Sequence, residues 1–258
     1  MKKKLSLALA LGLACSAALS GCGGSSGETE PQTIAEATTE APSSEATEAA
    51  EGETEAPAAS GAQEMTFILS NEPDGIDPGI TNNSFASVFL ANCFEGLVTY
   101  DATGTVVGGN AESWDISDVG TVYTSHLRDG LKWSDGSDLT ANDYVYAMQR
   151  VLDPATGGQY VDILTAYIKN AEEYYSGEAT ADDLGIKAID DQTLEITLIQ
   201  PTSFFVDLLT MWVFDPVQQA TIEANGDQWT ASADTYICNG PFKITEMNMG
   251  ESRVLEKN

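Results

Sequence analysis

The sequence predicts an α/β fold for residues 65–258, and three observations support this prediction. Residues 121–127 and 193–198 alternate apolar and polar side chains, as half-buried strands do. Residues 140–152 instead carry apolar side chains at helical spacing. Two short segments near the end are separated by a turn that contains Gly250. We therefore expect mixed sheets that are covered by helices.

The first expected elements are a buried strand over 65–70 and a helix over 84–97. The strand prediction rests on the run Met-Thr-Phe-Ile-Leu-Ser, which a turn-rich segment closes. Ser84 is the predicted N-cap of the helix. A polar loop, residues 77–83, leads towards it. The apolar side chains at helical spacing are Phe85, Val88, Phe89, Cys93 and Leu97.

The helix over 140–152 carries its own start and stop signals. Thr140 and Asp143 resemble a capping box, with Asp in place of the usual Glu or Gln. The Asp-Pro pair at 153–154 ends the helix. Its apolar face comprises Tyr144, Met148 and Val151, alongside Val145 and Leu152. The remaining expected elements are a helix over 161–175, a helix that begins at 202, and strands over 241–246 and 252–256.

Charge and histidine content exclude several classes of function. Forty acidic residues stand against eleven basic ones, which gives a net charge of −29. Such a chain repels phosphate backbones, so we expect no nucleic-acid partner. His126 is the only histidine in the sequence and lies in an alternating segment, which favours a strand residue over a catalytic base. We therefore expect no metal site, no cofactor and no enzymatic activity.

The first 21 residues have the features of a lipoprotein signal peptide. Three lysines precede an apolar run, residues 5–19, which would rise only about 22 Å as a helix and is too short to span a bilayer. Residues 19–22, Leu-Ser-Gly-Cys, resemble the bacterial lipobox. That resemblance implies cleavage before Cys22 and a lipid on its thiol, which would anchor the protein to the outer face of the cell membrane. An ordinary cleavage site that happens to precede a cysteine is the alternative.

Residues 22–64 are predicted to be a disordered acidic linker. Positions 23–64 contain ten glutamates and no lysine, arginine or aromatic residue, and Ile34 is the only aliphatic residue larger than alanine. Such a segment buries too little apolar area to offset the entropy of ordering it. A flexible chain of this length reaches about 35 Å. It would therefore hold a folded domain away from the membrane.

Three segments of the folded part resemble the extracellular solute-binding proteins of family 5. They are 111–115 (Ala-Glu-Ser-Trp-Asp), 126–136 (His-Leu-Arg-Asp-Gly-Leu-Lys-Trp-Ser-Asp-Gly) and 139–146 (Leu-Thr-Ala-Asn-Asp-Tyr-Val-Tyr). Residues 94–97, 182–191 and 239–242 also fit the family pattern. Within the family, the sequence is similar in particular to the oligopeptide-binding lipoproteins of ABC importers. Dipeptide, nickel and sugar binders share the fold.

The resemblance implies a class II periplasmic-binding-protein-like fold. Residues 65–95 and 216–258 would then form the first part of lobe I, and residues 96–215 an inserted α+β subdomain. Members of the family usually continue through a second lobe, past the position that matches Asn258. The resemblance therefore implies an N-terminal portion, whether from a truncated gene or from a partial record.

The resemblance also implies a function and a site. Such proteins capture extracellular oligopeptides in a cleft by main-chain strand pairing and deliver them to ABC permease subunits. The backbone segment that pairs with peptide maps onto Asn82, Asn83 and Ser84, and a cleft-lining tyrosine maps onto Tyr160. A polar loop and a packing aromatic are the alternative interpretations. A different solute (dipeptide, nickel or oligosaccharide) and a role as a peptide-sensing receptor also remain open.

Two cysteines, Cys93 and Cys238, would remain after processing at Cys22. In an exported protein they could form a disulfide. Cys93 lies on the apolar face of a predicted helix, which is equally compatible with a buried free thiol. The sequence does not decide between the two, because it does not show whether their Cα atoms lie within about 7 Å.

Overall fold

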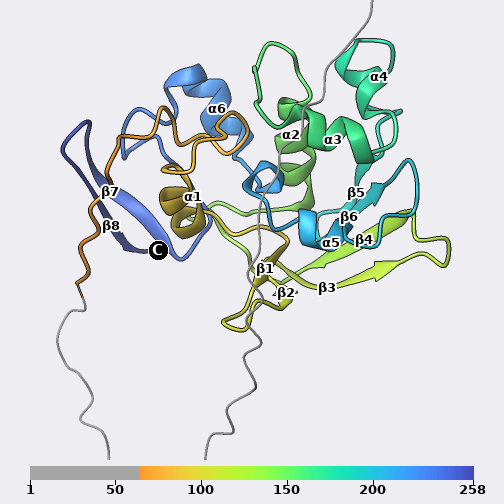
Figure 1. The fold of residues 1–258 in the computed structure, drawn as a ribbon, viewed down its shortest axis with the longest axis horizontal. Coiled ribbons are helices and arrows are strands. Elements are labelled where there is room, and N and C mark those ends of the chain that lie inside the picture. Colours follow the sequence, from red (N-terminus) through yellow and green to blue (C-terminus); the bar gives the residue numbers. More distant parts are fainter. Residues whose placement is uncertain (1–63) are drawn as a thin grey trace, which may run out of the picture. The chain divides into compact units, whose positions relative to one another are not determined.

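A four-stranded sheet and the helix α2 organise the middle of the protein, for which a computed structural model describes residues 64–258. The predictions for the signal peptide, Cys22 and the linker lie outside these residues. The sheet order is β3 (Ala111–Ile116), β4 (Val122–Leu127), β6 (Thr193–Thr197) and β5 (Ile186–Asp190), and each neighbouring pair is antiparallel. The two alternating segments are therefore confirmed as adjacent strands, shown in Figure 1.

The alternation in β4 and β6 places one side of the sheet in the core. Tyr123 is opposite Ile196 and Ser125 is opposite Leu194, and all four are buried. Helix α2 (Ala141–Val151) packs against β5 and β6. Its predicted apolar face is confirmed, since Tyr144, Met148, Val151 and Leu152 are all at most 1% exposed.

The capping box at the start of α2 is also confirmed. The Asp143 carboxylate accepts hydrogen bonds from the Thr140 backbone N–H at 2.8 Å and from the Thr140 hydroxyl at 3.3 Å. An aspartate therefore replaces the usual glutamate without loss of the box, because its shorter side chain still reaches the N-cap.

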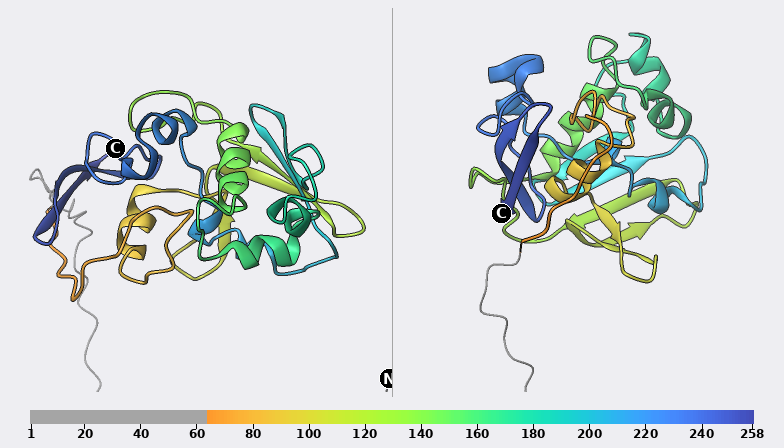
Figure 2. Two further views of the ribbon diagram at one scale, coloured as in Figure 1. Left: turned by 90° about the horizontal axis from the view of Figure 1, so that it is seen from above. Right: turned by 60° about the vertical axis from the view of Figure 1, so that its left-hand side comes forward.

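Shorter elements complete the described chain, as Figures 1 and 2 show. Some precede the sheet, some lie between its strands, and the others connect it to a separate hairpin near the end. The helices are α1 (Ser87–Cys93), α3 (Val161–Tyr167), α4 (Ala171–Tyr175), α5 (Phe205–Leu208) and α6 (Gln219–Asn225), with 3₁₀ turns η1 (Trp212–Phe214) and η2 (Gly226–Gln228). The remaining strands form two hairpins, β1 (Val98–Tyr100) with β2 (Val106–Gly108), and β7 (Phe242–Asn248) with β8 (Ser252–Lys257). Within residues 64–258, no helix has the length and apolar character that crossing a bilayer requires.

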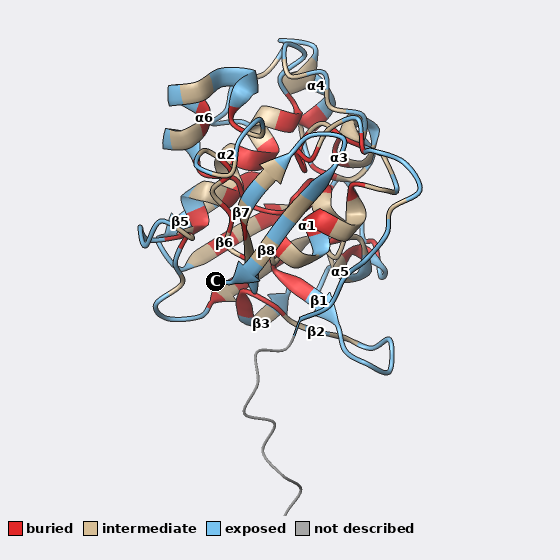
Figure 3. Ribbon diagram, turned by 90° about the vertical axis from the view of Figure 1, so that its left-hand side faces the viewer, coloured by how far each residue is buried: buried red, intermediate tan, exposed pale blue. Residues whose placement is uncertain are grey.

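The final hairpin is confirmed as predicted, and α1 packs against it. Figure 3 shows β7 and β8 with their outer face exposed, and β8 has no buried residue. All strand pairs among the described residues are antiparallel, whereas we expected mixed sheets. The α/β class itself is confirmed, because helices cover the sheets as predicted.

The predicted strand over 65–70 is wrong. These residues form no strand, and Met65, Phe67 and Ile68 are 75%, 68% and 94% exposed. An apolar run becomes a strand only where another strand pairs with its backbone. Among the described residues, no strand pairs with this segment.

The predicted helix over 84–97 is shorter than expected, and Ser84 is not its N-cap. Helix α1 begins at Ser87 and ends at Cys93, and the cap position is Ala86. Asn83 stabilises the preceding turn instead, because its side-chain oxygen accepts the Phe85 N–H at 2.8 Å. An asparagine competes well for local backbone N–H groups, so it displaces the start of the helix.

The predicted helix over 161–175 is broken into α3 and α4. Ile168 forms an isolated bridge with Leu198, and the Lys169 N–H donates to the Thr197 carbonyl at 2.9 Å. Asn170 then adopts a left-handed conformation with φ 58°. Contacts with the end of β6 therefore override the helical pattern. The helix expected from 202 is reduced to the single turn α5 for residues 205–208.

Candidate ligand-binding site

A buried ion pair fixes the loop that carries the predicted binding residues. The Arg150 guanidinium donates to both carboxylate oxygens of Asp77, at 3.0 and 2.7 Å. The same carboxylate accepts the Trp229 indole N–H at 2.8 Å and the Gly79 backbone N–H at 2.9 Å. Both charged side chains are about nine-tenths buried, at 10% and 9% exposure. A buried charge is stable only when it is paired and hydrogen-bonded, and Asp77 meets both conditions.

The predicted segment Asn82–Ser84 follows this anchored loop and leaves part of its backbone free. Asn82 and Ser84 are exposed. The Asn83 N–H donates to the Thr81 hydroxyl at 3.1 Å. No hydrogen bond among the described residues uses the N–H or the C=O of Asn82, or the N–H of Ser84. These free groups are the kind that an extended ligand can pair with.

The structure brings Tyr160 close to the same loop. The Gln159 N–H donates to the Ile80 carbonyl at 3.1 Å, which joins the two segments directly. The Tyr160 ring lies 5.9 Å from the ring of Trp212, and the Trp212 indole N–H donates to the Thr81 carbonyl at 3.0 Å. Trp212 therefore contacts Tyr160 and Thr81, the residue just before the predicted segment Asn82–Ser84. Sequence reasoning missed it, because it lies in a short 3₁₀ turn without a periodic pattern.

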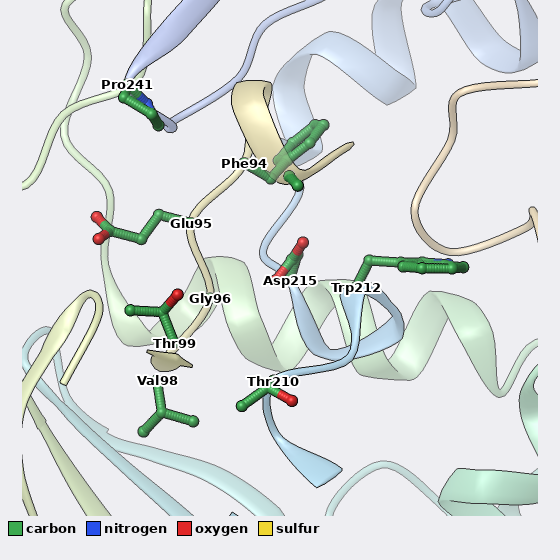
Figure 4. Close-up of a pocket in the computed structure, with 10 residues that line it drawn as sticks. Phe94, Glu95, Gly96, Val98, Thr99, Thr210, Trp212, Asp215 and Pro241 are labelled. Atoms are coloured by element: carbon green, nitrogen blue, oxygen red, sulfur yellow. The ribbon is translucent and has the colours of Figure 1, made fainter. Parts of the chain in front are cut away.

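Trp212 also lines a pocket of about 240 Å³ that contains two acidic residues, Glu95 and Asp215. Figure 4 shows the Asp215 side chain near Phe94, with the Trp212 ring pointing away from it. The Glu95 carboxylate lies on the other side of the chain segment that carries Phe94 and Glu95, and it also points away from Asp215. Thr99 and Thr210 add hydroxyl groups, and Val98, Phe94 and Pro241 add apolar surface.

Asp215 is a mostly buried residue whose carboxylate oxygens are not among the fully buried, unpartnered side-chain atoms of residues 64–258 and still reach the pocket. Its exposure is 8%, and none of the hydrogen bonds and ion pairs of residues 64–258 involves its carboxylate. Burial raises the pKa of Asp215 well above its ordinary value, and the negative charge of Glu95 raises the pKa further. No local pattern in the sequence points to Asp215, because only the tertiary fold buries it beside a second acid.

The backbone around Glu95 is held firmly in place. Asn110 and Asn239 donate their side-chain N–H groups to the Glu95 carbonyl, at 2.7 and 2.8 Å. At Gly96, a Cβ atom would lie 2.7 Å from the Asp215 Oδ1 atom, so this position has room only for glycine. The Asp215 carboxylate consequently lies directly over the main chain of the pocket wall.

The two cysteines and His126 lie outside this site. Cys93 and Cys238 are buried free thiols, and the hydrogen bond between them, together with burial, raises the pKa of Cys93. His126 lies on β4, where its Nε2 is 2.9 Å from the Asp115 carboxylate at the surface of the sheet. Among residues 64–258, no group of three His, Cys, Asp or Glu side chains could hold a metal ion.

Comparison with known proteins identifies the class. Residues 105–258 match the family described as bacterial extracellular solute-binding proteins, family 5 Middle, and the chain belongs to this family. It is 37% identical over 194 residues to the oligopeptide-binding protein OppA of Bacillus subtilis. It is also 38% identical over 200 residues to YgiS of Escherichia coli, a probable deoxycholate-binding periplasmic protein. The predicted family is therefore confirmed.

Solved structures agree with this assignment. An oligopeptide-binding protein of an ABC transporter from Borrelia burgdorferi superposes with a TM-score of 0.70 and 43% identity, covering 72% of this chain and 37% of that one. The periplasmic-binding-protein-like fold is confirmed on this basis. The matched regions cover 75% and 76% of this chain but only 35% and 37% of the Bacillus and Escherichia relatives. The chain thus spans little more than a third of their length.

Proposed function

We propose that this chain is the N-terminal part of a substrate-binding lipoprotein of an ABC importer, which captures extracellular oligopeptides and delivers them to permease subunits. The observation that carries the proposal is the free backbone of Asn82 and Ser84 beside Tyr160 and Trp212. An extended peptide can pair with these groups as an added strand and place side chains against the two rings.

The proposed division into lobes follows the packing of the elements. The four-stranded sheet and α2 lie within residues 96–215, the proposed inserted subdomain. Helix α1 packs against β7, which joins residues 65–95 to residues 216–258 in the proposed first lobe. The Asp77–Arg150 pair links the two regions and fixes the binding loop at their junction.

Main-chain pairing predicts an unusual mutational pattern. Asn82→Pro removes the backbone N–H, whereas Asn82→Ala removes only the side chain and serves as the matched control. We expect peptide binding to be lost in the proline variant and retained in the alanine variant, as measured by calorimetry with a tri- to pentapeptide library. Each main-chain hydrogen bond to the peptide competes with water and nets only about 0.5–1.5 kcal/mol, so we expect dissociation constants near 1 mM, about −4 kcal/mol. Equal loss in both variants would point to side-chain recognition instead.

The relatives also define the competing solutes. YgiS is a probable deoxycholate-binding protein at the same level of identity as the peptide binders, so deoxycholate belongs in the titration beside dipeptides, Ni²⁺ and an oligosaccharide. Saturable binding of one of these, without any binding of oligopeptides, would remove peptide as the ligand while leaving the family intact. A peptide-sensing receptor would bind peptide equally well, and only a transport assay would separate the two roles.

The lipid anchor is tested by a single substitution. The lipobox motif predicts that Cys22→Ala moves the protein from the membrane fraction to the soluble fraction. Fractionation of cells that express either form measures this directly, with Cys93→Ala as a control that leaves the lipobox unchanged. If the Cys22 variant stayed in the membrane fraction to the same extent, the proposed anchoring on the outer face would be wrong.

A further inference from the structure

The end of helix α1 and the segment that leads into β7 lie side by side, although they are far apart in the sequence (Figure 1). The Gly240 N–H donates to the Cys93 carbonyl at 2.7 Å. The Asn239 side chain accepts the Glu95 N–H at 3.2 Å and donates to the Glu95 carbonyl at 2.8 Å. A Cβ atom at Gly240 would lie only 2.5 Å from the carbonyl carbon of Cys93, so the two main chains are in direct contact.

This contact brings together the two cysteines of the described chain. Cys93 is the last residue of α1, and Cys238 lies shortly before β7. Both are 0% exposed, and their thiols are hydrogen-bonded to each other. Ser134 fixes the backbone of Cys238, because its hydroxyl accepts the Cys238 N–H at 3.2 Å and its own N–H donates to the Cys238 carbonyl at 2.8 Å. Two thiols in contact, on main chains that are held together, are within reach of the roughly 2.05 Å bond of a disulfide.

The surroundings of the two sulfur atoms differ. The hydrogen bond from the Cys93 thiol lowers the pKa of Cys238, against the effect of burial, and the hydroxyl of Ser134, the N–H of Gly240 and the charge of Lys243 lower it further. The bond between the thiols and burial raise the pKa of Cys93. Because a thiolate rather than a thiol attacks a disulfide, Cys238 is the sulfur suited to react first.

We propose that Cys93 and Cys238 form a disulfide in the exported protein, which fastens the end of α1 to the segment before β7. The chain belongs to a family of bacterial extracellular proteins, and disulfides persist in the oxidising surroundings of such proteins. The bond closes a long loop that contains the whole four-stranded sheet and α2. It also secures the helix that follows the loop with Asn82–Ser84, whichever ligand the protein binds.

The oxidant is itself a disulfide, either that of an exported thiol oxidoreductase or glutathione disulfide. The Cys238 thiolate attacks one sulfur atom of the oxidant, whose S–S bond breaks and releases a first thiolate. Cys93 loses its proton to solvent, attacks the Cys238 sulfur and releases the second thiolate. The two cysteines thus lose two protons and two electrons, and the oxidant becomes two thiols. Because both cysteines are fully buried in the folded chain, the exchange takes place during folding, before α1 docks on β7.

The experiment uses the whole chain, secreted by a bacterial host. The protein is denatured in guanidinium with N-ethylmaleimide, with or without earlier reduction by a phosphine, and peptide mass spectrometry reports the labelling of each cysteine. We expect Cys93 and Cys238 to be labelled only after reduction. Without reduction, their two peptides should appear joined, lighter by two hydrogen atoms than the sum of the free peptides. A second sample, reduced and then refolded with glutathione disulfide, supplies the oxidant directly.

Matched variants isolate the bond. Cys93→Ala leaves Cys238 without a partner, so Cys238 should be labelled without reduction. The double variant with Cys238→Ala is the control for the reductant. Because the disulfide constrains a long loop of the unfolded chain, we expect reduction to lower the melting temperature of the unmodified protein by about 5–10 °C and to leave that of the double variant unchanged. The labelling of the unmodified protein decides the question even if the variants fold poorly.

The outcomes are clear-cut. Joined Cys93 and Cys238 peptides that form within one chain would support the proposal. Labelling of both cysteines without reduction, in the secreted and in the refolded protein, would overturn it, and so would a bond from either cysteine to a second chain. An unchanged melting temperature on reduction of a chain that carries the bond would overturn the fastening of α1. Each negative result leaves the proposed peptide function in place, because that function does not depend on the two cysteines.

Discussion

Two aspartates in this fold, Asp77 and Asp215, are both more than nine-tenths buried, at 6% and 8% exposure, yet their surroundings differ completely. Asp77 has a bidentate arginine, an indole N–H and a backbone N–H. Asp215 has no donor and a second acid nearby. The first arrangement stabilises a loop, whereas the second leaves a carboxyl group whose pKa is raised by burial and by Glu95. Burial alone therefore does not show how a carboxylate is stabilised, whereas its set of hydrogen-bond and ion-pair partners does.

The largest change in the free energy of unfolding is expected for Asp77, whose carboxylate has an ion-pair partner and hydrogen-bond donors. Asp77→Ala leaves the Arg150 charge and the Trp229 N–H buried without their acceptor. We expect the free energy of unfolding to fall by about 3–5 kcal/mol, as measured by urea denaturation followed by circular dichroism. The double variant with Arg150→Met removes both charges, so its cost should be smaller than the sum of the two single costs. Strictly additive losses would show that the pair is not coupled.

For Asp215 we expect a substitution to raise the free energy of unfolding rather than lower it. Asp215→Asn removes a buried acid whose ionisation nothing in the described chain stabilises. We expect the free energy of unfolding at pH 7 to rise by about 1 kcal/mol. The same urea denaturation measures it, with Asp227→Asn as the exposed control. A loss of stability as large as that of Asp77→Ala would contradict the contrast between the two carboxylates.

The same gain in the free energy of unfolding should depend on pH. Because burial and Glu95 raise the pKa of Asp215, the folded state holds its proton more tightly than the unfolded state does. Below the unfolded pKa, near pH 4, the original protein and Asp215→Asn should have nearly equal stability. As the pH rises through the folded pKa, the original protein should lose stability relative to the variant.

Urea denaturation of both proteins from pH 3.5 to pH 8 measures this difference in the free energy of unfolding. Because the two proteins share all the other carboxylates, the titration of those groups cancels in the difference. The Asp227→Asn control should follow the original protein throughout. A gap that stays constant across the range would mean that Asp215 titrates normally in the folded state.

The candidate binding site was only partly predictable from the sequence. The resemblance to the family placed Asn82–Ser84 and Tyr160 on separate segments, and the structure joins them through the bond between Gln159 and Ile80. Trp212 and the Asp215 pocket had no sequence signal, because neither belongs to a periodic or motif-like pattern. Their roles depend on contacts between segments more than 50 residues apart, such as Trp212 with Thr81.

The sequence by itself determined the elements whose signals are local. The alternation in β4 and β6, the capping box and apolar face of α2, and the final hairpin all formed as predicted, because turn geometry and side-chain periodicity act over a few residues. Tertiary structure alone decided the rest. It left residues 65–70 without a strand partner, broke the expected helix where Ile168 meets Leu198, and buried Asp215 without a donor. Each of these outcomes depends on which distant segment lies alongside, and a local pattern holds no information about that neighbour.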